Sequence, residues 1–208
     1  MDAKKKSLSA TERDEAKRAA WRAEVADLDP TRSVFLDECG THLAHTRAYG
    51  RAPRGERAVG RVPRNRGRVT TLIASLTPRG VGPVATRQGG TTKDVFLAYP
   101  REELAPTLAP GQIGVRDNLG AHRPAAVRQI VEATGARVLS LPAYSPDFNP
   151  IELAFGTPKA ALRRAEARTR ETLDAAIGAA LAAITPAHVR GFFAHCGDLL
   201  KDQPLRPT

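Results

Sequence analysis

Three acidic residues have the types and the placement that phosphoryl-transfer chemistry requires. Asp37 follows one short apolar run, Asp117 follows another, and Glu152 lies in the first turn of an expected helix. Carboxylates at the ends of separate elements can meet in one site, and carboxylate oxygens are preferred ligands of hard divalent cations such as Mg²⁺ and Mn²⁺. The pattern therefore predicts a divalent-metal site in an enzyme that cuts and joins nucleic acid strands.

The stretch 141–152, LPAYSPDFNPIE, is expected to position Glu152. It contains a strand end, a loop with three prolines and the start of a helix, and proline fixes the backbone angle φ at each of its positions. Asp147 in this stretch is a rival for the third acid, but we expect its loop to turn outward. Glu38 is a rival of Asp37, yet alternation along a strand sends the two to opposite faces, so at most one points into a shared site.

The net charge favours a polyanionic partner. The 208 residues carry a formal charge of +10, with a pI of about 10.3. Each phosphate that such a protein neutralises releases counterions, which favours binding to nucleic acid. The alternative interpretation of the charge is a protein from an arginine-rich proteome.

Eight arginines gather between positions 47 and 68, where the only acid is Glu56. Glycines and prolines between them argue against a helix and favour a loop or irregular hairpin. The guanidinium fork matches phosphate, so we expect DNA contact; a solvated charged loop is the alternative. The expected DNA-contacting residues are Arg47, Arg51, Arg54, Arg57, Arg61, Arg64, Arg66 and Arg68, with Lys159 and Arg163, which share a helix face with Glu152.

Other classes of protein are disfavoured. Cys39 and Cys196 lie far apart, so neither a zinc site nor a disulfide framework is expected. No apolar run approaches the roughly 18 residues of a membrane span. The charged N-terminus is not a secretory signal, and we expect a cytoplasmic protein.

The periodicity predicts an α/β fold. Strands are expected at 34–36, 69–76, 81–87, 113–115 and 138–141, and helices at 12–28, 94–97, 124–134, from 150 on, at 171–184 and at 186–200. The sheet should be mixed, antiparallel early and parallel late. We expect an N-terminal helical extension (1–30), a catalytic domain (31–170) and C-terminal helices packed on it (171–208). Gly156 and Pro158 are expected to kink the helix that follows Pro150.

Three ordered motifs carry a resemblance to a known family. They are FLDECG at 35–40, RDNLGAH at 116–122 and LPAYSPDFNPIE, and 34 residues lie between Asp117 and Glu152. Over about residues 8–200 the chain resembles the transposases of bacterial insertion sequences related to the mariner superfamily. The resemblance implies a ribonuclease-H-like fold flanked by helices and a DDE catalytic triad of Asp37, Asp117 and Glu152, with Asn118 and His122 as supporting residues.

The resemblance also implies cofactors and partners. Two Mg²⁺ or Mn²⁺ ions, about 3.5–4 Å apart, would assist cleavage and strand transfer. Asp37 would bridge both ions, and Asp117 and Glu152 would hold one each. The partners would be double-stranded DNA at the element ends and the target, a second copy in a homodimer, and a separately encoded helix-turn-helix half, because the first 30 residues have room for one helix. Two alternatives stay open: a catalytically inactive DNA-binding remnant, and a ribonuclease or resolvase on the same scaffold.

Overall fold

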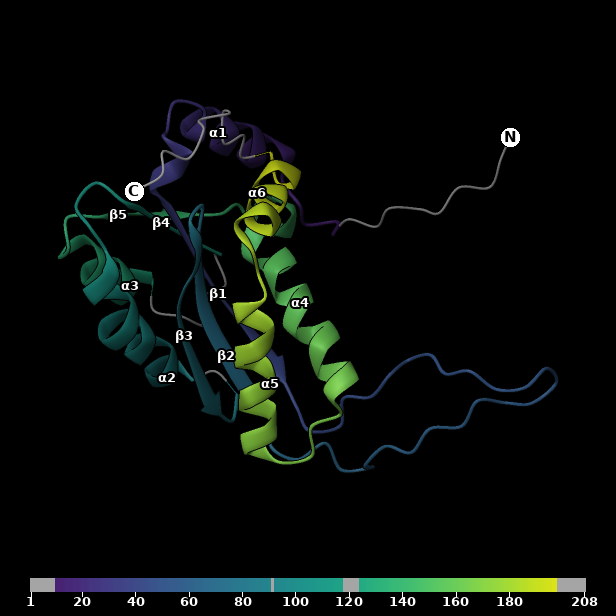
Figure 1. Ribbon diagram of the computed structural model, residues 1–208. Helices are drawn as coiled ribbons and strands as arrows, with labels where there is room; N and C mark the ends of the chain where they lie inside the picture. Colours follow the sequence, from purple (N-terminus) through teal and green to yellow (C-terminus); the bar gives the residue numbers. More distant parts are fainter. Residues whose placement is uncertain (1–9, 91, 118–123, 198–208) are drawn as a thin grey trace, which may run out of the picture.

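A five-stranded sheet with helices on both faces forms the body of the protein (Figure 1). The structure is a computed structural model that describes residues 10–90, 92–117 and 124–197. The strand order is β3-β2-β1-β4-β5; β1 pairs antiparallel with β2 and parallel with β4, which confirms the mixed sheet. The strands are β1 (Ser33–Thr41), β2 (Thr70–Thr77), β3 (Gly80–Gln88), β4 (Ile113–Arg116) and β5 (Arg137–Ser140).

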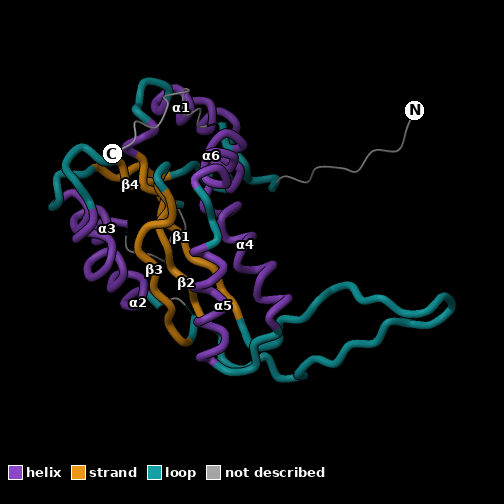
Figure 2. The backbone as a smooth tube through the Cα atoms, in the orientation of Figure 1, coloured by secondary structure: helices purple, strands orange, loops and turns teal. Residues whose placement is uncertain are grey.

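The helices divide between the two faces of the sheet. α2 and α3 cover one face, and α4, α5 and α6 cover the other, as Figures 1 and 2 show. The helices are α1 (Glu15–Val25), α2 (Lys93–Tyr99), α3 (Pro124–Glu132), α4 (Pro150–Ala165), α5 (Arg170–Ala182) and α6 (Pro186–His195). Short helical turns lie at Pro30–Arg32, Pro100–Leu104, Ala105–Thr107 and Pro146–Phe148.

Strand β1 separates two hydrophobic clusters. Phe35 and Cys39 belong to the cluster that includes residues of α4, α5 and α6, whereas Val34 and Leu36 belong to the cluster under α2 and α3. Side chains alternate along a strand, so Asp37 lies on the α4 face of the sheet and the next residue on the opposite face. This arrangement agrees with the expectation that only one acid of the pair enters a shared site.

The first acid lies deeper in the sheet than the sequence suggests. The expected strand ends at residue 36, which would place Asp37 at its exit. Instead, β1 continues to Thr41, because its antiparallel pairing with β2 extends as far as the Thr41–Thr70 pair. Asp37 therefore lies within a strand, while Asp117 does directly follow β4 as expected.

Residues 42–69, here called the arginine loop, contain no helix or strand and extend away from the body (Figures 1 and 2). The base of the loop is bonded to the turn between α4 and α5. The Glu166 carboxylate accepts a hydrogen bond from the Thr46 hydroxyl (2.8 Å), and Arg168 donates to the Leu43 carbonyl (3.0 Å). The irregular backbone confirms the prediction from glycine and proline content.

Helix α4 runs without a break through Gly156 and Pro158, so the expected kink does not interrupt it. Pro158 removes one backbone hydrogen bond. It is buried on the same helix face as Phe155 and Leu162, and the packing of this face on the sheet offsets that loss. Glu152 is consequently carried by a helix of 16 residues.

The remaining helices differ from expectation mainly at their ends. α1 begins at Glu15, where Asp14 accepts a hydrogen bond from the Lys17 amide, and it ends at Val25 instead of residue 28. α6 ends at His195; positions 198–200 of the expected helix lie outside the described residues. No single helix in the described part of the chain is long and apolar enough to cross a membrane, and the α5–α6 pair, which reaches that length together, is bent by 81°.

Replacing Gly156 by Ala should stabilise the protein. A Cβ at this helical position meets nothing within 4 Å, and glycine inside a helix is less favourable than alanine. We expect the free energy of unfolding to rise by roughly 0.5–1 kcal/mol in urea denaturation. Gly135→Ala is the control: Gly135 has φ +81° and its Cβ would lie 3.1 Å from the Pro110 Cβ, so this variant should lose stability. A loss of stability in Gly156→Ala would contradict the uninterrupted packing of α4.

Candidate active site

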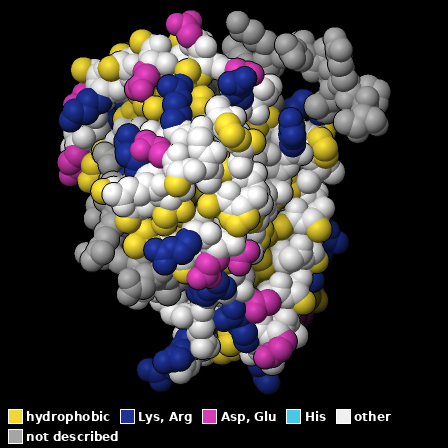
Figure 3. Space-filling model, turned by 90° about the vertical axis from the view of Figure 1, so that its left-hand side faces the viewer, with side chains coloured by type: hydrophobic (Ala, Val, Ile, Leu, Met, Phe, Trp, Pro, Cys, Tyr) yellow, Lys and Arg dark blue, Asp and Glu magenta, His cyan; other side chains and the backbone are white. Residues whose placement is uncertain are grey.

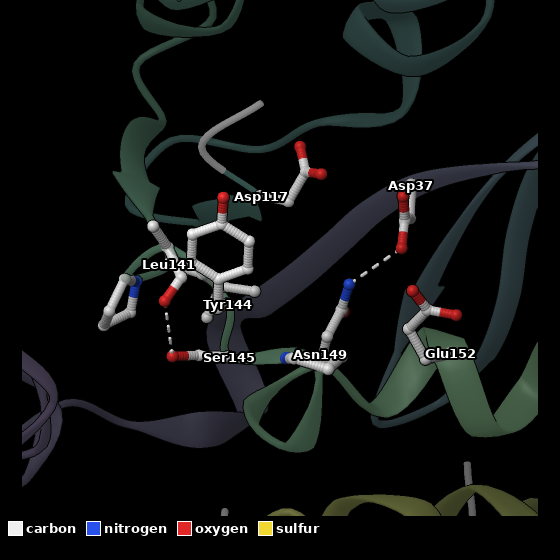
Figure 4. Close-up of a pocket in the computed structure, with 10 residues that line it drawn as sticks. Asp37, Asp117, Leu141, Tyr144, Ser145, Asn149 and Glu152 are labelled. Atoms are coloured by element: carbon white, nitrogen blue, oxygen red, sulfur yellow. Dashed lines mark hydrogen bonds between the residues drawn. The ribbon is translucent and has the colours of Figure 1, made fainter. Parts of the chain in front are cut away.

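One pocket of about 440 Å³ brings the three predicted acids together. Figure 4 shows that Asp37 and Glu152 lie close to Asn149, with Asp117 across the pocket. The other lining residues come from the stretch between β5 and α4, here called the site loop (141–149). The complete lining is Asp37, Asp117, Leu141, Pro142, Ala143, Tyr144, Ser145, Pro146, Asn149 and Glu152.

The sheet register explains how Asp37 and Asp117 meet. β1 and β4 are parallel neighbours in which Leu36 lies opposite Arg116, so the next residue of each strand falls at the same level and on the same face. Glu152 reaches this level because α4 packs on β1 and begins directly after the site loop. The pattern predicted these three residues from separate elements, and the fold brings them to one pocket.

Asn149 is a site residue that the sequence-based prediction did not include. It occupies the N-cap position of α4, where an Asn side chain usually accepts a hydrogen bond from the backbone of the first turn. Here the cap bond is not made; instead Asn149 Nδ2 donates to Asp37 Oδ2 (2.9 Å). Asn149 is 2% exposed, and its Oδ1 is buried without a hydrogen-bond partner. The signal for it was an Asn before a helix-starting proline, which also fits an ordinary cap.

Burial dominates the electrostatics of Asp37. The pKa of its carboxyl is raised from 3.8 to about 8, chiefly by burial and next by the negative charge of Glu152. The Glu38 amide, which donates to Asp37 Oδ1 (2.8 Å), lowers the pKa by less than Glu152 raises it. Asp37 is therefore protonated at neutral pH unless a cation compensates its charge. Such a buried carboxylate beside other acids has the chemistry of a divalent-cation ligand.

The donor set fits a hard divalent cation, although the side chains do not yet surround one. Asp37, Asp117 and Glu152 supply oxygen ligands of the kind that Mg²⁺ and Mn²⁺ prefer. Within residues 10–90, 92–117 and 124–197, no three His, Cys, Asp or Glu side chains are close enough, as they stand, to hold one ion. Coordination would require the carboxylates to turn further into the pocket.

Basic groups of α4 lie on the same side of β1 as the acids. Burial raises the pKa of the Cys39 thiol to about 11, while the nearby Lys159 ammonium opposes this shift and Asp37 and Glu152 add to it. Lys159 thus lies near Cys39, on the face of β1 that also carries Asp37. Arg163, one turn further along α4, contributes to lowering the pKa of His45 at the base of the arginine loop, after burial and His42.

The other predicted residues fall in three groups. All eight arginines of the arginine loop are exposed, and none of them lines the pocket. Asp147 does not line it either. The Asp147 carboxylate accepts hydrogen bonds from Arg18 (2.6 and 3.0 Å) and therefore faces α1, in agreement with the expected outward turn of its loop. Asn118 and His122 lie outside the described residues.

Tyr144 is the second lining residue that sequence-based prediction did not single out. Its φ is +56°, a left-handed conformation that non-glycine residues rarely adopt, and its side chain is 56% exposed. Strained backbone of this kind concentrates at functional sites. The residue types around Tyr144 do not predict this backbone strain, because the strain depends on the path of the chain between Pro142 and Pro146.

A family model matches most of the chain. The family is described as DDE superfamily endonuclease, and the match covers residues 32–174, which include the three acids, the arginine loop and α4. No curated protein matches the chain in sequence.

Solved structures of Mos1 transposase share the fold. The Mos1 strand transfer complex aligns with a TM-score of 0.69 at 20% identity, over 95% of this chain and 63% of that chain. The Mos1 mariner paired-end complex with Mn aligns with a TM-score of 0.68 at 20% identity, over 95% of this chain and 64% of that chain. The catalytic domain of Mos1 mariner transposase aligns with a TM-score of 0.58 at 18% identity, over 88% of this chain and 86% of that chain. The chain thus has a ribonuclease-H-like fold. It spans less than two thirds of the Mos1 chain in the strand transfer complex and in the paired-end complex.

Metal-free protein should lose stability as pH rises, and Asp37→Asn should remove much of that loss. The folded state raises the pKa of Asp37 from 3.8 to about 8, so its contribution to stability is complete below pH 4 and is lost as the pH rises towards 8. In EDTA, the variant should match the wild type near pH 4 and exceed it by up to roughly 5 kcal/mol above pH 8, measured by urea denaturation. Equal pH dependence in both proteins would contradict burial of this carboxyl.

Proposed function

This chain belongs to the DDE superfamily endonuclease family, and we propose that it is the catalytic part of a DNA transposase that cleaves DNA strands and transfers them. The observation that carries the proposal is the pocket in which Asp37, Asp117 and Glu152 meet. They come from β1, from the position directly after β4 and from α4 of a ribonuclease-H-like fold, in the order Asp, Asp, Glu. We assign them as the catalytic and metal-binding residues.

The cofactor we propose is Mg²⁺ or Mn²⁺, as two ions. Solved Mos1 complexes contain Mg or Mn, and the oxygen ligands of this pocket suit either ion. When bound, two such ions would stabilise charge on the attacking and leaving oxygens of an in-line displacement at phosphorus. Asp37 is the best candidate for a ligand shared by both ions, because it is the most buried of the three acids and lies within β1.

The chain's own residues have separate tasks in this proposal. Asn149 donates a hydrogen bond to one oxygen of Asp37 and thereby restrains this carboxylate beside the pocket. Lys159 and Arg163 follow Glu152 along α4 and would contact phosphates on either side of the cleaved bond. Leu141, Pro142 and Pro146 of the site loop contribute an apolar wall to the pocket.

The partner we propose is double-stranded DNA, with the arginine loop as a second contact region. Eight exposed arginines on a segment that extends from the body can reach backbone phosphates without competing for the pocket. On the side of the molecule shown in Figure 3, by contrast, basic and acidic side chains are interspersed. A homodimer and a separately encoded helix-turn-helix half remain part of the proposal, as does a catalytic unit at 31–170 with helical extensions on either side.

One observation favours a second candidate, a DNA-binding remnant without activity. The acids as they stand, within the described part of the chain, do not form a closed metal site. The continuous helix α4 weighs against this candidate, since Glu152 lies in the first turn of a helix that Pro158 does not interrupt. Activity measurements with Mn²⁺ separate the two.

Asp117→Asn should abolish Mn²⁺-dependent cleavage while leaving the fold intact. The substitution removes one negative ligand from the pocket but preserves the size and shape of the side chain. We expect at least about a thousandfold loss in the rate of nicking a labelled duplex, with an unchanged circular dichroism spectrum. Glu132→Gln on α3 is the matched control and should cleave at the wild-type rate. Full activity of Asp117→Asn would overturn the assignment of the site.

Removing charge from the arginine loop should weaken DNA binding more than removing equal charge elsewhere. The triple variant Arg51→Ala, Arg54→Ala, Arg57→Ala should lower both the affinity and the slope of log K against log salt, by up to about 0.9 for each phosphate that the protein no longer neutralises. The control is Arg101→Ala, Arg128→Ala, Arg137→Ala, which removes the same charge from other exposed positions. Fluorescence anisotropy across a salt series measures both. Equal slopes for the two variants would show that the loop is only a solvated charged segment.

A further inference from the structure

Arg18 in α1 is completely buried although it carries a charge. Its guanidinium forms a two-pronged ion pair with Asp147 of the site loop: Nη1 donates to Oδ1 (3.0 Å) and Nη2 to Oδ2 (2.6 Å). The two residues are 129 positions apart in the chain. Burial alone raises the pKa of the Asp147 carboxyl, but the hydrogen bonds and charge of Arg18 outweigh it and leave the pKa below its ordinary value. A bidentate ion pair of this kind restricts both the distance and the relative orientation of the guanidinium and carboxylate groups.

A second buried residue of α1 contacts the same short segment. Trp21 stacks on the Phe148 ring, with centroids 5.1 Å apart and planes 14° from parallel. The Arg18 guanidinium lies 3.9 Å from the centre of that ring. Arg18 and Trp21 are the buried residues of α1, and each of them contacts position 147 or 148 of the site loop.

The residue that follows this contact connects it to two of the acids. Asn149 donates to Asp37 Oδ2 (2.9 Å), and its backbone carbonyl accepts from the Glu152 amide (3.1 Å) as the cap of α4. A shift of Asp147 and Phe148 would therefore move both the partner of Asp37 and the first turn that carries Glu152.

We propose that Arg18 is a positioning residue for the acidic site: through Asp147 and Asn149 it fixes the orientation of Asp37 and the placement of Glu152. The inference rests on the proposed metal-binding role of these acids. A contribution to stability alone would not require this arrangement, because the Asp147 side chain is 46% exposed and ion pairs that reach solvent contribute little to stability. The bidentate pair of Arg18 and Asp147 instead sets the position of the site loop, as residues that hydrogen-bond to metal ligands set the orientation of those ligands.

The test compares Arg18→Lys and Asp147→Asn with the wild type. Arg18→Lys keeps the charge but loses the fork, and Asp147→Asn keeps the size but weakens the pair. Ile177→Val in α5 is the control, since it removes one methyl group from the same hydrophobic cluster at a position outside α1 and the site loop. The readouts are Mn²⁺ affinity by isothermal titration calorimetry, and kcat and KM for duplex cleavage. Trp21, the only tryptophan, reports by its fluorescence whether α1 still packs on Phe148.

We expect Mn²⁺ affinity to fall about tenfold in Asp147→Asn and by a smaller factor in Arg18→Lys, with kcat lowered and KM for DNA unchanged. The control should bind and cleave as the wild type does. If Asp147→Asn does not fold, Arg18→Lys decides. Wild-type affinity and kcat in a folded variant whose Trp21 fluorescence has changed would overturn the inference.

Failure of the proposed function gives a different result. A wild type that binds Mn²⁺ but cuts no DNA would refute the transposase proposal, while the Mn²⁺ affinities of the variants would still decide the role of Arg18. A wild type that binds no Mn²⁺ would overturn both.

Discussion

The buried carboxylate of Asp37 is the constraint on which the rest of the site depends. A negative charge in the middle of a β-sheet is unfavourable unless protons, hydrogen bonds or cations compensate it. Here the compensation is partial: the Glu38 amide and Asn149 each donate to one oxygen, and the pKa nevertheless rises to about 8. Glu152 adds a like charge nearby. The protein thus maintains an arrangement that is unfavourable without a cation, and ligand sites for divalent metals have this property.

The fold supports that arrangement with elements that are individually ordinary. Parallel pairing of β1 and β4 sets Asp37 beside Asp117, and the packing of α4 on β1 brings Glu152 to the same level. The Asn149 side chain does not make the hydrogen bond that usually caps a helix such as α4, and instead it donates to Asp37. A local rule that is broken at a functional site in this way is consistent with selection for the site rather than for helix stability. α1 then secures the site loop through Arg18 and Trp21, so a segment outside the sheet takes part in the geometry of the pocket.

Much of this was predictable from the sequence, because the signals were local. Apolar runs and turn residues indicated five strands and the mixed sheet, and the three acids followed from their placement and from the motifs around them. The misses share a physical cause, which is tertiary packing. The length of β1 depends on pairing with β2, which begins only at Thr70, beyond the whole arginine loop, and Pro158 is tolerated because its helix face is buried. Asn149 and Arg18 could not be recognised in advance, because their roles depend on contacts with residues 112 and 129 positions away.

The central claim is that Asp37, Asp117 and Glu152 together bind divalent cations, and anomalous X-ray diffraction from crystals soaked in MnCl₂ tests it without assuming any activity. The account predicts anomalous peaks in the pocket, within coordination distance of all three carboxylates, with Asp37 turned so that it shares its oxygens between two ions. Peaks that lie elsewhere on the surface, or a pocket that stays empty at Mn²⁺ concentrations saturating for ordinary carboxylate sites, would contradict it.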